Sequence, residues 1–240
     1  MAEKPILFST PMVQAILEGR KTMTRRVIKN AIGWDPIWKV SKETDTSYCM
    51  RAGTQYSVPY FKCPYGQPGD LLWVRETFYA YGHWEHNGTT KTLKQKWRFL
   101  DRTYWNKNMP DGGYYYEDKS PSNFHKGYST VDGYYIRPSM FMPKEAARIW
   151  LRVTDIRVER FQDISEEDAI DEGIEIFKDE FGFRIPIKEQ FGFYRTNITS
   201  DAFRALWINI NGPESWDLNP FVWVVSFEVV SKNGKYSNDK

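Results

Sequence analysis

Residues 17–27, LEGRKTMTRRV, place four cations and two threonine hydroxyls within seven residues of the 240-residue chain. Clustered cations can hold a phosphate group, and a lysine beside a threonine hydroxyl can serve as the base that activates a nucleophile. The same cations also suit a solvated helix end, where the helix dipole favours positive charge. On its own, the segment therefore allows a solvated turn, a phosphate clamp or one side of an active site.

The elements before this segment predict a turn at its start. A short strand is expected from Ile6 to Phe8, and the following helix has Thr10 as its N-cap and stops at Gly19. In a regular strand, Lys21 and Thr24 would point to opposite faces. Cooperation between these two side chains therefore requires the chain to turn after Gly19.

Further along, the pattern predicts strands that lead and close the chain, with short helices between them. Strands are expected from Leu71, over 147–161 with a bulge near Thr154, and over 221–230; helices are expected over 163–174 and near 200–208. Strands and helices do not alternate regularly. An α+β fold, built on a small mixed β-barrel with short flanking helices, is therefore favoured over a doubly wound sheet.

Two stretches, at about 31–66 and 79–143, do not fit this pattern. We interpret them as long insertions in a single domain that covers residues 1–240. The second insertion is rich in Tyr, Gly, Lys and Asn, and the whole chain has 15 Tyr, 15 Phe and 10 Trp. Aromatic residues favour strands, and exposed rings can also stack on nucleobases.

The charge of the chain is unevenly distributed. The net charge of +2 does not by itself indicate a binding partner. Residues 1–30, however, are basic, and residues 163–180 are strongly acidic. Two such segments are either separate solvated faces or opposite walls of one site.

The residues that most often bind metals are few. There are two cysteines, Cys49 and Cys63, and three histidines, His83, His86 and His125. Their spacing matches no common zinc module, so neither a metal nor another cofactor is expected. No signal peptide opens the sequence and no apolar run is long enough to cross a membrane, which predicts a cytoplasmic protein without a membrane partner. No obligate protein partner is indicated.

The segment GRKTMTRR (19–26) resembles the G-x-K-x-x-[E/T]-x-R signature of ASCH domains, with Gly19, Lys21, Thr24 and Arg26 at the signature positions. The turn PGD before the strand at Leu71 is similar to the Gly-Asp step of this family. The resemblance implies a PUA-like β-barrel, and it covers roughly residues 5–30, 67–78, 147–174 and 221–230. The whole chain is also similar to longer ASCH-related proteins of phages and prophages.

Small bacterial members of the ASCH family hydrolyse N4-acetylcytidine to cytidine and acetate. They use a lysine and a threonine of the signature together with a glutamate on a later helix. The resemblance therefore implies Lys21, Thr24 and Glu172 as catalytic residues, since Glu172 stands seven residues after the capping Ser165 in SEEDAIDEG. Those enzymes have less than half this chain length, so the insertions would form a substrate wall, block the site or add a nucleic-acid surface.

These residue types are sufficient for amide hydrolysis. A threonine hydroxyl needs a neighbouring base, and a lysine can be that base when burial or nearby cations lower its pKa. Arg20, Arg25 and Arg26 supply such cations and are also predicted to bind substrate. A carboxylate such as Glu172 can accept a proton and return it to the leaving amine, and no metal is required. Glu172 would otherwise be an exposed helix residue among other anions.

Three functions are compatible with these residues, each with a modified nucleoside or a nucleic acid as the partner. The first is an amidohydrolase that removes the acyl group from an N4-acylated cytosine, free or within nucleic acid. The second is an RNA- or DNA-binding module without catalysis, whose arginines grip phosphates. The third is a ribonuclease, although the signature segment has no histidine. We favour the first and expect Lys21→Ala and Thr24→Ala to fold normally and to lose hydrolysis.

Overall fold

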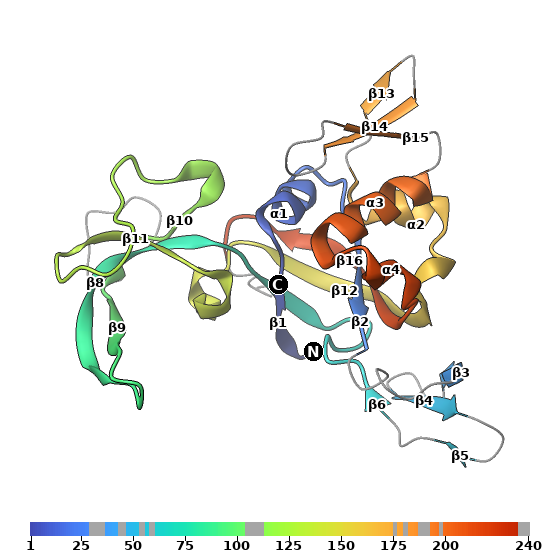
Figure 1. Ribbon diagram of the computed structural model, residues 1–240, viewed down its shortest axis with the longest axis horizontal. Coiled ribbons are helices and arrows are strands. Elements are labelled where there is room, and N and C mark those ends of the chain that lie inside the picture. Colours follow the sequence, from blue (N-terminus) through green and yellow to red (C-terminus); the bar gives the residue numbers. More distant parts are fainter. Residues whose placement is uncertain are drawn as a thin grey trace, which may run out of the picture.

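The computed structural model describes residues 1–28, 37–42, 47–52, 56–57, 61–103, 113–174, 177–179, 182–186, 193–196 and 199–234. Four separate sheets and four α-helices are found in this part of the chain (Figure 1). Among these residues, no helix is long and apolar enough to cross a membrane. One mixed sheet, three antiparallel sheets and few helices are compatible with the predicted α+β class.

The central sheet has five strands in the order β1-β7-β12-β16-β2. These are β1 (Glu3–Leu7), β7 (Leu71–Arg75), β12 (Trp150–Arg160), β16 (Phe221–Ser231) and β2 (Met23–Val27). β1 pairs with β7 in parallel, and the other neighbours pair antiparallel. β1 and β2 are the two edges of the sheet, so within the described residues the sheet is open and does not close into the expected barrel.

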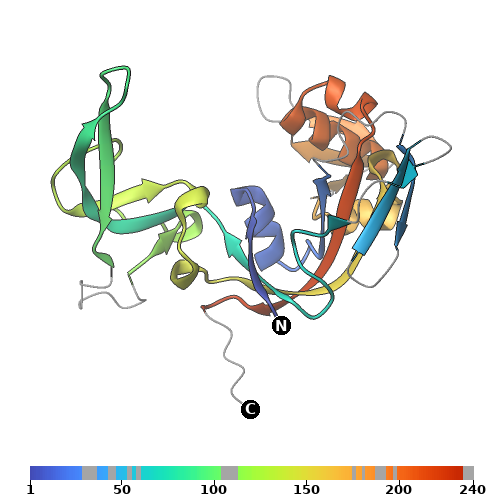
Figure 2. The same cartoon turned by 90° about the horizontal axis from the view of Figure 1, so that it is seen from below.

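The long strands β12 and β16 form the centre of this sheet. Their register shifts between Val153 and Asp155, which confirms the bulge expected near Thr154. On either side of the shift, alternate residues of both strands face one apolar core, which explains the change in alternation along β12. Figure 2 shows both strands curving along the length of the central part.

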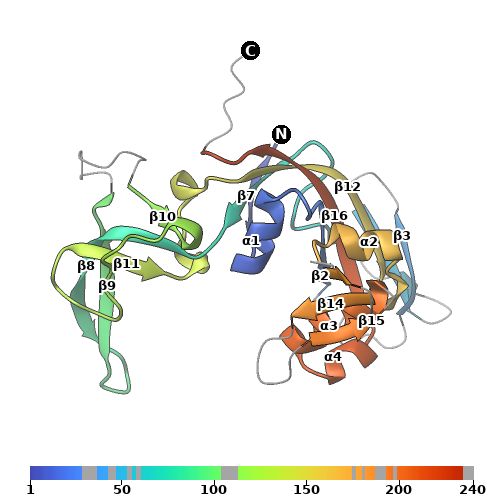
Figure 3. The ribbon, with the colours of Figure 1, turned by 90° about the horizontal axis from the view of Figure 1, so that it is seen from above.

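Helices cover both faces of the central sheet. Helix α1 (Thr10–Leu17) packs Val13 and Ile16 into the core on one face. On the other face, α2 (Glu166–Asp171), α3 (Thr199–Asn211) and α4 (Glu214–Asp217) lie beside β2 and β16 (Figure 3). The N-cap of α1 is Ser9 and not Thr10, which is already helical; this corrects the expected boundary by one residue.

Strands within residues 78–103 and 113–137 form a separate four-stranded sheet, and we call these residues the lobe. It contains β8 (Phe78–Thr89), β9 (Gln95–Asp101), β10 (Tyr115–Tyr116) and β11 (Gly133–Arg137). Short 3-10 turns accompany it at η3 (Glu117–Lys119), η4 (Ser139–Phe141) and η5 (Lys144–Ala146); η6 (Phe161–Asp163) follows β12. In Figures 1, 2 and 3 the lobe extends from the central sheet, on the opposite side of α1 from α2 and α3.

The remaining strands form two small sheets. Within the first predicted insertion lie β3 (Ile37–Lys42), β4 (Ser47–Ala52), β5 (Tyr56–Ser57) and β6 (Phe61–Lys62). Between α2 and α3 lie β13 (Phe177–Asp179), β14 (Gly182–Pro186) and β15 (Phe193–Thr196), which the sequence patterns did not predict. The side chain of Cys49, in β4, lies outside the described residues.

Candidate active site

The site lies where the chain enters β2 and leaves α2. Gly19 has a φ of +79°, the left-handed conformation that ends α1 and gives the expected turn. β2 begins only at Met23, so the strand alternation does not apply to Lys21. Instead, Lys21 forms a single antiparallel bridge with Glu172, and the Thr22 amide donates to the Asp171 carbonyl at 2.9 Å.

The local sequence explains why α2 ends at this point. Ser165 is the N-cap, and its hydroxyl accepts from the Asp168 amide at 3.1 Å, as the sequence predicted. After Glu172 the chain turns at Gly173, whose φ is +85°. A Cβ atom on Gly173 would lie 2.7 Å from the Cβ of Lys21 and 2.9 Å from the Cβ of Ala15. Glycine therefore permits the close approach that brings Glu172 to Lys21.

Lys21 and Glu172 form a buried ion pair. The Lys21 Nζ lies 2.6 Å from Glu172 Oε2 and also donates to the Glu172 carbonyl oxygen at 2.8 Å. Lys21 is 0% exposed and Glu172 is 9% exposed. Because removing one member of such a pair leaves the other charge buried, Lys21→Ala is no longer expected to leave folding unchanged.

The environment of Lys21 lowers the pKa of its ammonium group. Burial lowers the pKa of its ammonium, while the neighbouring Glu172 carboxylate raises it and the charges of Arg26 and Arg25 lower it. The net direction is downward from the ordinary lysine value of 10.5. Two of the three arginines predicted to act on Lys21 do so, but burial is the larger cause.

Thr24 and Arg26 lie on one face of β2, since they are two residues apart in a strand. Thr24 is opposite Val225, a residue of the core on the α1 side, and is 2% exposed. The Arg26 guanidinium lies over the ring of Phe8 at 5.1 Å, and the Lys21 ammonium lies 5.7 Å from the same ring. Phe8 therefore lies beside both Lys21 and Arg26.

Arg25 points to the other face of β2 and takes part in an internal charge network. Its guanidinium contacts Asp168 Oδ2 at 2.6 Å and Glu159 Oε1 at 2.7 Å, and its side chain is 1% exposed. Arg157 donates to the same two carboxylates. The network fastens α2 to β2, so Arg25 is better placed to position Glu172 than to bind a phosphate.

Arg20 also supports α2. Its guanidinium donates to the Gly173 carbonyl at 2.8 Å and to Glu18 at 2.7 Å. Of the three arginines predicted to bind substrate, Arg26 is therefore the one that lies beside Lys21 and Phe8. The basic segment 1–30 and the acidic segment 163–180 contact each other directly through ion pairs, so they do not form two separate walls of a site.

Three buried polar atoms around this pair have no hydrogen-bond partner among the described residues. They are Glu172 Oε1, Arg25 Nε and Arg26 Nε. Arg25 approaches Glu172 Oε1 only to 3.6 Å. Thr24 likewise makes no side-chain hydrogen bond within the described part of the chain. Unsatisfied buried groups are uncommon in folded proteins and cluster where a ligand or a reaction uses them.

The sequence did not indicate Phe8 or Tyr65 as members of the site. Tyr65 packs at the edge of the core, and burial raises the pKa of its hydroxyl while the charge of Arg26 lowers it. Phe8 follows β1, and an apolar residue at a strand end is normally part of a core. Nothing in its type or spacing distinguishes it as a neighbour of Lys21.

Among the described side chains, the histidines and Cys63 do not converge. His83 and His86 lie on opposite faces of β8; His83 Nδ1 contacts Asp132 Oδ1 at 2.7 Å, and His86 packs against Trp97. Burial raises the pKa of the Cys63 thiol to about 11. Within the described ranges, no group of three metal-ligating side chains is found.

Comparisons of the chain with models of protein families, with curated proteins and with solved structures found no match. The geometry of Lys21, Thr24 and Glu172 therefore has to support the functional argument.

Proposed function

We propose that this protein is an amidohydrolase that removes the acyl group from an N4-acylated cytosine, with N4-acetylcytidine as the simplest substrate. The proposal includes a relationship to ASCH domains with a PUA-like barrel, on the basis of the signature at residues 19–26. Thr24 would be the nucleophile, and Lys21 and Glu172 would move the proton. Arg26 would contact the substrate.

The observation that carries the proposal is the buried Lys21–Glu172 pair, in which one carboxylate oxygen makes no hydrogen bond within the described residues. A lysine whose pKa is lowered by burial can accept a proton from a hydroxyl. Glu172 Oε2 contacts Lys21, whereas Oε1 makes no hydrogen bond within the described residues and lies 3.6 Å from Arg25. A pair that served only to stabilise the fold would gain from satisfying that oxygen as well.

In the first half of the reaction, neutral Lys21 accepts the hydroxyl proton of Thr24 as Oγ1 attacks the acyl carbon. The proton then passes along the 2.6 Å contact from Lys21 Nζ to Glu172 Oε2. Glu172 returns it to N4 of cytosine while the carbon–nitrogen bond breaks. Cytosine leaves with a complete amino group, and the acyl group remains on Thr24 as an ester.

In the second half, a water molecule attacks the ester carbon. Lys21 accepts the proton of the water and returns it to the Thr24 oxygen as the ester bond breaks. The products are the carboxylic acid and free Thr24, and both catalytic groups regain their starting protonation states. Arg26, beside Lys21, is placed to stabilise the negative charge that develops on the acyl oxygen in both halves.

A nucleic-acid-binding module without catalysis is the second candidate. The Arg26 guanidinium lies over Phe8, and its Nε makes no hydrogen bond among the described residues. This position favours an anionic or planar ligand, whether the protein is an enzyme or only a binding module. A ribonuclease is less well supported. The three histidines lie in the lobe, and the signature segment contains none.

The proposal can be tested by incubating the protein with N4-acetylcytidine and identifying the acylated residue. Rapid quenching followed by peptide mass analysis should find an acetyl group on the peptide that contains Thr24. The Thr24→Ala protein should carry none. Turnover without any acylation of this peptide would exclude Thr24 as the nucleophile and would require direct attack by water.

A further inference from the structure

One face of the lobe carries a layer of aromatic rings. Trp84 and His86 of β8 are opposite Phe99 and Trp97 of β9, so these four side chains share a face. Tyr128 covers the layer: it stacks on Trp97 with a centroid distance of 5.6 Å and an interplanar angle of 7°. Tyr128 is 62% exposed, far more than a ring that only fills a core.

Arg137 of β11 lies among the rings of this layer. Its guanidinium is 4.4 Å from the centre of Phe99, 4.7 Å from that of Trp84 and 5.1 Å from that of Phe141. Within the described residues it makes no hydrogen bond or close ion pair, and the Asp101 carboxylate is the charge that acts on it. A cation held flat on aromatic rings keeps its edge donors free for an anion or for the edge of a base.

The charges around this layer are predominantly positive. Lys91, Lys94, Lys96 and Lys126 are exposed and have no ion pair among the described residues. The anions nearby are already engaged, because Glu85 contacts Arg98, and Asp132 contacts both His83 and Arg102. Asp101 accepts hydrogen bonds from Thr103 and Tyr114. The lysines are therefore the uncompensated charges of this surface.

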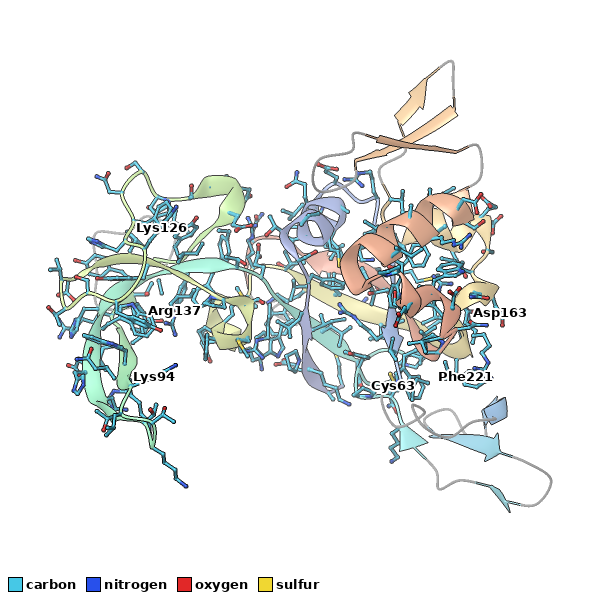
Figure 4. The ribbon with its side chains drawn as sticks, viewed as in Figure 1. Cys63, Lys94, Lys126, Arg137, Asp163 and Phe221 are labelled. Atoms are coloured by element: carbon cyan, nitrogen blue, oxygen red, sulfur yellow. The ribbon has the colours of Figure 1, made fainter. Side chains whose placement is uncertain are left out.

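Figure 4 shows how these cations are distributed. In this view Arg137 lies between Lys94, toward the β8–β9 turn, and Lys126, on the segment before β11.

The lobe is also held to the central part of the protein. Arg148, just before β12, contacts Glu76 at 2.9 Å and Asp118 at 2.8 Å, and Thr10 of α1 bonds to Glu117.

We propose that this face of the lobe binds single-stranded nucleic acid, with Tyr128 and Trp97 stacking on bases and Lys91 and Lys94, in the β8–β9 turn, contacting phosphates. Exposed rings combined with unpaired cations are the features that bind single strands without sequence preference. A duplex hides the faces of its bases, so it would use the cations alone. An acidic protein would use the cations and leave the exposed ring without a partner.

This inference deepens the proposed function and, in its link to substrate, rests on it. If the reaction acts on an acylated cytosine within a strand, the lobe would hold the neighbouring nucleotides. The binding surface itself does not require catalysis. Strand binding and nucleoside hydrolysis can therefore fail independently.

Fluorescence anisotropy with a labelled single strand of about 15 nucleotides, prepared as DNA and as RNA, tests the proposal. The double variant Lys91→Glu/Lys94→Glu should weaken binding at least tenfold and make the dependence of log affinity on log salt shallower by about 1.4, or about 0.7 per phosphate contact. A matched control, Arg204→Glu/Lys232→Glu, makes the same change in charge on the central part of the protein. It should change affinity less than threefold, because charges beyond about 10 Å are screened at 0.1 M salt.

Stacking is tested separately at Tyr128. Tyr128→Ala should weaken binding by about 5- to 150-fold, the usual effect of losing one stacked base, and Tyr128→Phe should retain it. No binding by the wild type, equal losses in the lobe and control variants, unchanged binding by Tyr128→Ala, or equally tight binding of a duplex would each overturn the proposal.

The same variants should hydrolyse N4-acetylcytidine at the wild-type rate. Strand binding without hydrolysis would contradict the proposed function and would support the nucleic-acid-binding surface of the lobe. Hydrolysis without strand binding would contradict the binding surface of the lobe and would support the proposed reaction. A preference between the RNA and DNA strands would show which polymer the surface accepts.

Discussion

Lys21 and Glu172 are 151 positions apart in the chain, yet the Lys21 Nζ lies 2.6 Å from Glu172 Oε2 in a buried ion pair. Three structural features produce this contact. Gly19 turns the chain after α1, Gly173 lets the end of α2 approach Lys21, and Arg25 fastens α2 to β2 through Asp168. The surrounding structure thus fixes the positions of both Lys21 and Glu172, as proton transfer between two side chains requires.

The two members of the pair should be energetically coupled. Lys21→Met leaves the Glu172 carboxylate buried without its main partner and should cost about 3–5 kcal/mol of unfolding free energy. Glu172→Gln should cost less, about 1–3 kcal/mol, because Lys21 can lose its proton. The double variant should be more stable than the sum of the single losses by about 1–3 kcal/mol. Denaturant unfolding of all four proteins measures this coupling, and additive losses would contradict a direct pair.

Thr24 is expected to be needed for hydrolysis and not for folding. Its side chain makes no hydrogen bond within the described residues, and it faces Val225. Thr24→Val removes no hydrogen bond among those residues and should change the unfolding free energy by less than about 1.5 kcal/mol, the usual worth of one hydrogen bond, while abolishing hydrolysis. Thr24→Ser keeps the hydroxyl and should retain measurable turnover. Full activity in the valine variant would exclude the nucleophile role.

The pH dependence of kcat/KM should report the proton on Lys21. The neutral lysine reacts, so the rate should rise as pH increases through a pKa below the ordinary value of 10.5. Arg26 is one of the charges that lower this pKa. Arg26→Gln should therefore move the rising limb to higher pH and reduce kcat/KM at pH 7. Arg20→Gln is the control, since Arg20 is not among the charges that shift the pKa of Lys21.

The lowered pKa of Lys21 also makes the free energy of unfolding rise with increasing pH. Its folded-state pKa is lowered, so the folded protein holds this proton less tightly than the unfolded chain does. The stability associated with the neutral lysine is fully present above about pH 10.5 and decreases as pH falls through the lowered pKa.

For the pH–rate profile, a rising limb of kcat/KM that did not move in Arg26→Gln would indicate that a group other than Lys21 titrates.

Gly173 should be more sensitive to substitution than Gly19. Both have a positive φ, but a Cβ at Gly173 would approach Lys21 to 2.7 Å, whereas nothing lies within 4 Å of one at Gly19. Gly19→Ala should cost about 1 kcal/mol for its backbone conformation alone. Gly173→Ala should cost a further 1–3 kcal/mol, about the usual cost of overpacking, and should reduce hydrolysis because it displaces Lys21 from Glu172. Equal effects of the two substitutions on stability and rate would contradict this packing.

The central strands were predictable because their periodicity is strong. In β12 and β16 one face is continuously apolar, and the slip near Thr154 is visible as a change in alternation. The helix that begins after Ser165 was predictable from its cap. In β8 the signal fails for a physical reason: rings lie on both faces, with Tyr79 and Tyr81 on one and Trp84 on the other, so no period of two remains.

The site was predictable only in part. The resemblance selected Lys21, Thr24 and Glu172, and the structure brings Lys21 and Glu172 together and places Thr24 on the adjoining strand. The burial of Arg25 does have a signal in the sequence, because in a strand it shares a face with the apolar Met23 and Val27. The contact between Lys21 and Glu172 has no periodic signal, since it joins positions far apart in the chain.

The most direct measurement is the conversion of N4-acetylcytidine to cytidine by the purified protein, followed by chromatography, with Glu172→Gln and Arg204→Glu measured in parallel. Turnover by the wild type and by Arg204→Glu, with a loss of about 10²-fold or more in Glu172→Gln, is the result we predict. Equal turnover by all three proteins, or none by the wild type while it remains folded, would contradict an amidohydrolase site built on Lys21, Thr24 and Glu172.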